Sequence, residues 1–161
     1  VDILPDGTLD MSDDVLAKAD IVLASVHKHL DMEPRALTRR LIRAMENPHV
    51  DVLAHPTGRS VGKSDYRVDV EELLCTAARL GVALEINCAP NRLDLDERLA
   101  RRCDDLGIAL AIGSDAHSVG EMDQFSLGVG VAQRARCTSH NILNARSPQE
   151  LRAWLDWHRN H

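Results

Sequence analysis

The stretch VDVLAHPTGR, residues 50–59, runs from an apolar, β-leaning segment straight into a histidine and a glycine-containing loop. The same order of residue types occurs in IVLASVHKH, residues 21–29, and in GIALAIGSDAHS, residues 107–118. In α/β proteins with parallel strands, the carboxyl ends of the strands gather on one face, where binding sites form. We therefore expect the polar residues that follow these three segments to lie together on one rim.

Strand-like and helix-like segments alternate along the chain, which is typical of an α/β fold with a parallel sheet. Pro34 and Gly81 stand where a helix start and a helix end are expected. Residues 128–136 fit either a strand followed by a helix or a helix alone. No repeat or linker interrupts the order, so we expect a single domain over residues 1–161. The predicted strands are 1–4, 20–26, 50–54, 82–87 and 108–113. Three predicted helices are 34–46, 70–80 and 147–158. Two more are a short helix capped by Ser12 and a helix that is capped at Asp94 and ends at Leu106.

Composition narrows the class of protein. The formal net charge of −6 argues against a broad nucleic-acid surface, which needs a basic face, and the four aromatic residues disfavour base stacking. Nucleic-acid chemistry at a bound cation stays open, because the cation reverses the local field. No apolar run is long enough for a membrane span, and no leader is recognised before Val1.

The chain has four cysteines, which are widely spaced and include no CxxC pair: Cys75, Cys88, Cys103 and Cys137. This spacing gives little support to a structural zinc ribbon or a redox dithiol. Cys75 and Cys103 fall among Leu and Ala on predicted helix faces, so we expect both to be reduced and packed in the core. A cytoplasmic setting fits this pattern.

The candidate metal ligands are His27, His55, Asp115 and His117. Imidazole suits transition metals, and carboxylate shifts the preference towards harder cations. Hydrolytic two-metal sites use such ligands to clamp a phosphoryl oxygen and to activate water. A lone strand-end histidine is more often a structural residue, but three strand ends bearing such residues favour a shared site. His29 fits a supporting or a solvated role equally well. We interpret the remaining histidines as surface residues: His49, His140, His158 and His161.

Further candidates lie beside these ligands. Glu85 and Asn87 lie on one face of a predicted strand. Glu85 would orient an imidazole or line the pocket, and the alternative is a salt bridge across the barrel interior. Asn87 would contact a substrate or ligand. Arg59, in the polar loop 56–67, and Arg92 are candidates to hold a phosphate, and the alternative for both is a solvated loop arginine. No GxSxG, Walker or GxGxxG motif offers a different chemistry.

Five strings of this sequence together resemble the PHP (polymerase and histidinol phosphatase) family: VDILPDGTLD (1–10), ASVH (24–27), ENPHVDVLAHPTGR (46–59), ALEINCAPNRLDL (83–95) and GSDAHS (113–118). The resemblance covers nearly the whole chain and is strongest to the C-terminal PHP module of bacterial family X DNA polymerases. It implies an α/β fold that is the C-terminal part of a distorted (β/α)7 barrel.

The resemblance also implies a function. His27, His55, Asp115 and His117 match metal-ligand positions for Mn²⁺ or Zn²⁺, with up to three ions in a complete family site, and we count His55, Asp115 and His117 as catalytic. The implied activity is phosphoester hydrolysis, in the polymerase-linked branch as a 3′–5′ exonuclease that processes DNA 3′ ends during repair. The alternatives are a small-molecule phosphomonoesterase of the histidinol-phosphatase type and a catalytically inactive scaffold.

Two motifs of the family are missing from the chain. The HxH motif of the first strand has no counterpart before His27, and the glutamate expected just before Val1 is absent. We interpret the chain as a fragment that lacks the N-terminal strands, with fewer metal ions than the complete site. Its expected partners are the upstream half of the barrel and a polymerase domain in the parent protein. An open sheet edge also predicts dimerisation or exchange of elements between chains.

Overall fold

Helices and short parallel strands alternate along the chain, in agreement with the sequence pattern. The computed structural model describes residues 1–61 and 67–160. The elements are α1 (Asp13–Leu16), β1 (Leu23–Ala24), α2 (Pro34–Met45), β2 (Val52–Leu53), α3 (Val70–Leu80), β3 (Ala83–Asn87), α4 (Glu97–Asp105), β4 (Leu110–Gly113), α5 (Phe125–Arg134) and α6 (Pro148–His158), with 3-10 helices η1 (Val119–Gln124), η2 (Ser139–Asn141) and η3 (Leu143–Ala145).

The four strands form one parallel sheet in the order β1-β2-β3-β4. This arrangement confirms the α/β class. Single parallel bridges extend the sheet at both edges, Asp2 to Ser25 beside β1 and Leu110 to Ile142 beside β4. The predicted first strand, 1–4, is therefore present only as bridges. Among the described residues β1 and β4 do not pair with each other, so the sheet does not close.

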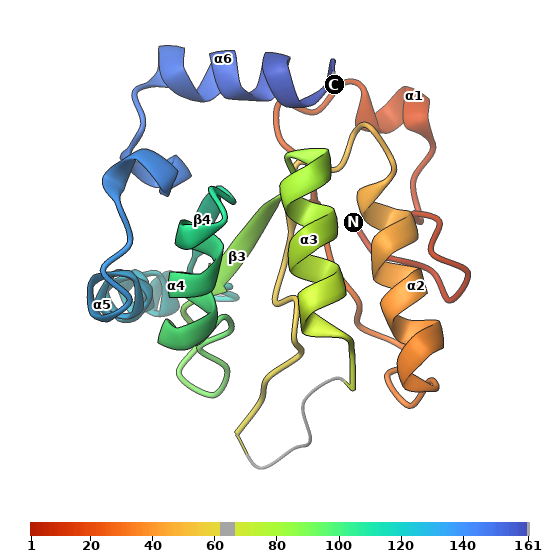
Figure 1. Ribbon diagram of the computed structural model, residues 1–161, viewed down its shortest axis with the longest axis horizontal. Helices are drawn as coiled ribbons and strands as arrows, with labels where there is room; N and C mark the ends of the chain where they lie inside the picture. Colours follow the sequence, from red (N-terminus) through yellow and green to blue (C-terminus); the bar gives the residue numbers. More distant parts are fainter. Residues whose placement is uncertain (62–66, 161) are drawn as a thin grey trace.

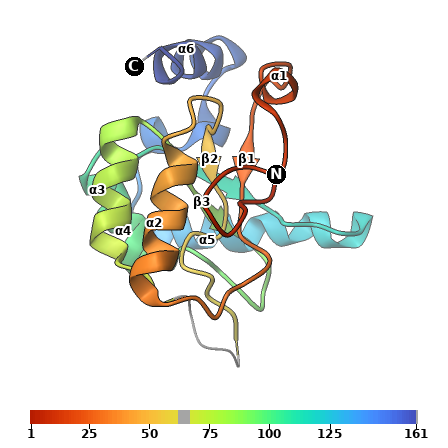
Figure 2. The same cartoon turned by 90° about the vertical axis from the view of Figure 1, so that its right-hand side faces the viewer.

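Helices α2, α3 and α4 pack side by side on one face of the sheet (Figures 1 and 2). The alternation of strand side chains places Leu84 and Ile86 of β3 in the large core on this face. Helix α2 contributes Leu41, Ala44 and Met45 to the same core, as its apolar spacing predicts. The opposite face carries smaller and polar residues, and there a second, small cluster unites Val52, Ala83, Ala109 and Leu143.

Helix α6 crosses the amino end of the sheet (Figure 1). Its predicted start is confirmed, because Ser147 and Glu150 form a reciprocal capping box. His158 is not a surface residue as predicted but is buried, and both ring nitrogens lie near backbone carbonyls, Nε2 2.9 Å from Val50 O and Nδ1 3.1 Å from Leu80 O. The helix packs onto the sheet through this residue, a contact that the sequence of α6 alone does not reveal.

Residues 125–134 form helix α5, which settles the ambiguity over 128–136 in favour of a helix. Gly128 lies where α5 meets β3 and β4. A Cβ at this position would collide with the Cys88 Sγ atom and approach the Ile112 side chain. The glycine therefore allows α5 to pack closely on the sheet.

Other local expectations need correction. Strands β1 and β2 contain two residues each, fewer than predicted. The cap of α4 is Asp96, which accepts a hydrogen bond from Leu99 N, because Asp94 is buried beneath another loop. Ser12 precedes α1 but makes no side-chain cap.

Cys103 is buried as predicted, but Cys75 is exposed. The reason is that α3 turns Leu73, Leu74 and Ala77 towards the core instead. His161 and part of the loop 56–67 lie outside the described residues. No helix in the described part of the chain is both long and apolar enough to cross a membrane.

Candidate functional site

His27 and His55 follow the carboxyl ends of the neighbouring strands β1 and β2, and their rings meet. The ring centroids lie 5.3 Å apart with an interplanar angle of 61°. The His55 side chain is buried, whereas half of the His27 side chain is exposed. The parallel register of β1 and β2 brings the two imidazoles to the same rim, as the sequence predicts.

The backbone at two of the predicted ligands adopts an unusual conformation. His55 has a φ of 32° and Asp115 a φ of 52°, both in the left-handed region that residues other than glycine seldom adopt. Such conformations persist only where surrounding contacts hold them, and they cluster at functional sites. At His55 one such contact is visible, because its backbone N–H donates to Glu85 Oε2 at 2.8 Å.

The His55 ring carries an unsatisfied nitrogen. Its Nδ1 atom is buried and has no hydrogen-bond partner among the described residues. Burial lowers the pKa of His55 to about 4, with help from the charges of Arg92 and His27. The ring is therefore neutral at neutral pH, which is the form that binds a metal ion.

Asp2 contacts His27 and was not recognised from the sequence. His27 Nδ1 donates to Asp2 Oδ1 at 2.5 Å, and this hydrogen bond holds the pKa of Asp2 below its usual value. With the proton on Nδ1, the neutral form of the His27 ring keeps a lone pair on Nε2, and Ser25 Oγ lies 3.4 Å from that atom. A carboxylate on the far nitrogen is the usual way in which proteins orient a metal-binding imidazole. The sequence carries no signal for this pair, since a bridge between Asp2 and Ser25 creates it.

Asp115 and Arg92 also belong to this cluster. Arg92 Nε lies 3.6 Å from Asp115 Oδ2. The charge of Arg92 lowers the pKa of His55, and the charge of Asp115 raises it. The structure thus brings a predicted substrate-binding arginine against a predicted metal ligand.

Glu85 is buried beside His55, but in the described part of the chain it neither orients an imidazole nor forms a salt bridge. It accepts from the backbone of His55 rather than from an imidazole, and Asn87 Nδ2 donates to the same carboxylate at 3.2 Å. Burial raises the pKa of Glu85 to about 7. On the adjacent strand Gly113 leaves room for it, since a Cβ there would collide with Glu85 Oε1.

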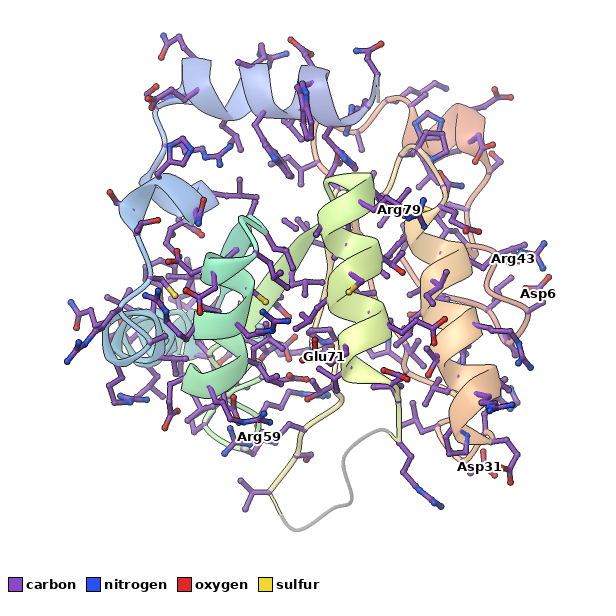
Figure 3. The ribbon with its side chains drawn as sticks, viewed as in Figure 1. Asp6, Asp31, Arg43, Arg59, Glu71 and Arg79 are labelled. Atoms are coloured by element: carbon purple, nitrogen blue, oxygen red, sulfur yellow. The ribbon has the colours of Figure 1, made fainter. Side chains whose placement is uncertain are left out.

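Arg59 lies at the end of the molecule where α2, α3 and α4 begin (Figure 3). Its guanidinium Nη1 donates to Leu93 O at 3.1 Å, and its backbone N–H donates to Asp94 Oδ2 at 3.2 Å. The loop after β2 is therefore tied to the loop after β3. Asp94, expected at a helix cap, is a second site residue that sequence reasoning missed.

His117 and His29 are exposed, and neither ring is in contact with another ring in the described part of the chain. His117 Nδ1 donates to Asp115 O at 2.7 Å, which leaves its Nε2 lone pair available. The ring contacts found in the described part of the chain include His27 with His55 but do not include His117. Within residues 1–61 and 67–160, no three His, Cys, Asp or Glu side chains are grouped closely enough to hold a metal ion. His27 and His55 thus fit part of a metal site, and the complete ligand set stays a prediction.

Comparison with known proteins gives relatives of two kinds. The chain is 42% identical over 156 residues, 96% of its length, to the DNA polymerase/3′-5′ exonuclease PolX of Bacillus subtilis. It is 32% identical over 149 residues to a probable phosphatase of a Thermoanaerobacter species and 31% identical over 157 residues to one of Shewanella sediminis. A scan against family models finds no match.

The chain spans 27% of the length of PolX and 58% and 61% of the lengths of these two probable phosphatases. It therefore corresponds to a part of each relative. The sequence motifs indicate a resemblance to a module of family X polymerases. The similarity to PolX, which extends over nearly the whole chain, confirms this resemblance.

Proposed function

We propose that this chain is the C-terminal part of a metal-dependent phosphoesterase module that processes DNA 3′ ends in its parent protein. The observation that carries the proposal is the meeting of His27 and His55 at the sheet rim, with the charge of Asp115 acting on His55. The relative at 42% identity, named as a DNA polymerase and 3′-5′ exonuclease, supports DNA as the substrate.

His27, His55, Asp115 and His117 would hold Mn²⁺ or Zn²⁺. The buried, unsatisfied Nδ1 of His55 suits such an ion. The Nε2 atoms of His27 and His117 would complete the imidazole ligands, and the one on His27 would exchange a long 3.4 Å contact with Ser25 Oγ for the metal. A bound divalent cation supplies Lewis-acid chemistry, because it lowers the pKa of water and stabilises charge on a phosphoryl group. We expect fewer than three ions on residues 1–161 by themselves, since the HxH motif of the family has no counterpart among them.

The remaining polar residues of the rim would bind and orient the substrate. Arg59 has further guanidinium donors besides the one bound to Leu93 O, and these suit a phosphate. Arg92 adds positive charge close to Asp115. Asn87 donates a hydrogen bond to the Glu85 carboxylate and would hold it in place beside His55. His55, Asp115 and His117 form the proposed catalytic group.

We propose that the described sheet is part of a seven-stranded barrel. Its four strands are parallel, and the face away from α2, α3 and α4 carries small or polar residues, which suits a barrel interior. The upstream strands would continue the sheet beside β1, where Asp2 already bridges to Ser25. We interpret residues 1–161 as one domain whose partners in the parent protein are the upstream half of the barrel and a polymerase domain.

An isolated chain with an uncovered edge should dimerise or exchange elements with a second copy. Light scattering at high concentration tests this expectation. A monodisperse monomer would contradict it, whereas a dimer that dissociates on addition of the upstream half would support it.

A small-molecule phosphomonoesterase is the second candidate, favoured by the relatives named as probable phosphatases. A catalytically inactive scaffold is the third, favoured by the lack of any three-ligand group among the described residues.

The deciding experiment supplies Mn²⁺ to the parent protein and compares release of nucleotides from a labelled oligonucleotide with hydrolysis of p-nitrophenyl phosphate. Release from the 3′ end that His55→Ala abolishes and His140→Ala preserves is the expected result. Hydrolysis of the small ester alone would favour the second candidate. No turnover of either substrate, with less than one metal ion per chain, would favour the scaffold.

A further inference from the structure

Asp94 is a fully buried carboxylate that links two loops of the rim. Its Oδ1 accepts from Thr57 Oγ1 at 2.7 Å, and its Oδ2 accepts from the backbone N–H groups of Thr57 at 3.1 Å and Arg59 at 3.2 Å. All three donors belong to the loop that follows His55. Asp94 itself lies in the loop after β3, so these bonds join segments that are distant in sequence.

Burying an acidic side chain costs free energy that burying an apolar side chain does not. Removing a carboxylate from water costs several kcal/mol, and burial accordingly raises the pKa of Asp94 to about 6. An apolar side chain would avoid this cost but would leave the buried backbone N–H of Thr57 and the partly buried N–H of Arg59 without this partner. The carboxylate is therefore explained by the loop conformation that it selects.

The loop from His55 to Arg59 needs such support. His55 and Gly58 both have positive φ angles, of 32° and 64°. Glu85 binds the backbone N–H at the start of the loop, and Asp94 binds the N–H groups at its middle and end. Two buried acids thus hold the loop from opposite ends, as a strained segment requires.

We propose that Asp94 is a positioning residue that fixes the loop 55–59 and thereby places His55 and Arg59 together at the rim. This inference rests on the proposed phosphoesterase function. Asp94 acts through Arg59 in particular, because Arg59 is bound twice to the Asp94 loop, by its backbone to Asp94 and by its guanidinium to Leu93 O. Arg59 would then meet a substrate phosphate in one fixed orientation.

The test uses two substitutions of Asp94 and one matched control. Asp94→Leu keeps the branched shape of the side chain, although its methyl groups are larger than oxygens, and it removes all acceptors. Asp94→Asn keeps the size and one oxygen that can accept from both backbone N–H groups. The control is Asp104→Leu at the far end of α4. Asp104 also accepts from a threonine N–H and hydroxyl, those of Thr138, at 2.9 and 3.1 Å.

The measurements are the Mn²⁺ dissociation constant and the KM for p-nitrophenyl phosphate in the parent protein. For Asp94→Leu we expect both to rise about tenfold, as for other residues that orient a site, while Asp94→Asn recovers most of the loss and Asp104→Leu changes neither. Thermal unfolding of the three variants separates these changes from lost stability. Equal effects of Asp94→Leu and Asp104→Leu would overturn the inference.

A double-mutant cycle tests the route through Arg59. If Asp94 acts on KM by orienting Arg59, Asp94→Leu should add little to the KM of Arg59→Ala. Additive effects in an active enzyme would refute the positioning role and leave the proposed function intact. A wild-type protein that neither binds Mn²⁺ nor turns over either substrate would instead remove the proposed function, and the inference with it.

Discussion

The imidazoles of His27 and His55 meet edge to face with their centroids 5.3 Å apart, although they follow different strands. One ring is fixed by a carboxylate on its Nδ1, and the other leaves its Nδ1 buried without a partner in the described residues. The pair therefore offers one oriented and one unsatisfied nitrogen at the same rim.

Asp2 should matter for metal binding although it is not a predicted ligand. Asp2→Ala removes the acceptor that keeps the proton on His27 Nδ1, so Mn²⁺ affinity is expected to fall about tenfold in calorimetric titration. Asp6→Ala is the control, since in the described part of the chain the Asp6 carboxylate accepts hydrogen bonds from Thr8 of its own turn. The bond from Arg43 to Asp6 uses the backbone carbonyl, which the substitution keeps. Equal affinities of the two variants would contradict the orienting role of Asp2.

Gly113 should tolerate no larger residue. Gly113→Ala would force its Cβ into the Glu85 carboxylate, and the free energy of unfolding is expected to fall by about 1–3 kcal/mol. Gly120→Ala is the matched control, because no atom lies within 4 Å of a Cβ built there. Urea denaturation measures both variants, and similar midpoints for the two would show that the Glu85 side chain moves aside.

Two arginines of the C-terminal region should differ sharply in their contribution to stability. Arg159 donates to both oxygens of the fully buried Asp51, at 2.9 and 2.7 Å, and its loss leaves that charge with only a distant contact to His158 at 3.9 Å among the described ion pairs. We expect Arg159→Ala to lower the free energy of unfolding by about 3 kcal/mol. Arg152→Ala, which removes an exposed pair with Asp20 at 3.7 Å, should cost at most about 1 kcal/mol in the same denaturation assay.

The raised pKa of Asp94 predicts that the free energy of unfolding changes with pH in a defined direction. Its pKa rises from 3.8 to about 6 on folding because of burial. The folded state therefore binds more protons than the unfolded state between about pH 4 and pH 6, and the wild-type free energy of unfolding loses this contribution as the pH rises. Asparagine does not titrate, so the stability of Asp94→Asn relative to wild type should rise across this window, by up to about 3 kcal/mol. Parallel pH curves from chemical denaturation of the two proteins would rule this out.

Much of the fold follows from local pattern. Helices α2 and α3 begin and end close to the predicted residues, because their apolar spacing and the boundary residues Pro34, Asp69 and Gly81 act locally. Strands β1 and β2 are shorter than predicted, since strand length depends on hydrogen bonds to neighbouring strands and not on the apolar run alone.

The site was accessible to prediction in part. The meeting of His27, His55 and Asp115 at one rim could be predicted, because each follows an apolar strand and parallel strands share a rim. The roles of Asp2 and Asp94 could not be predicted. Nothing in VDIL or NRLDL shows whether an aspartate binds another segment of the chain, caps a helix or faces solvent. The burial of His158 was missed for the same reason, because its partners lie before β2 and at the end of α3.

The sequence by itself determined the order of strands and helices and the residues that stand at the strand ends, because these depend on the periodicity of side chains within a single segment. Only the tertiary structure decided which acid binds which loop, which histidine is buried and which ring nitrogen is left open. Those properties arise from hydrogen bonds and desolvation between segments far apart along the chain, and their geometry exists only once the strands have packed into one sheet.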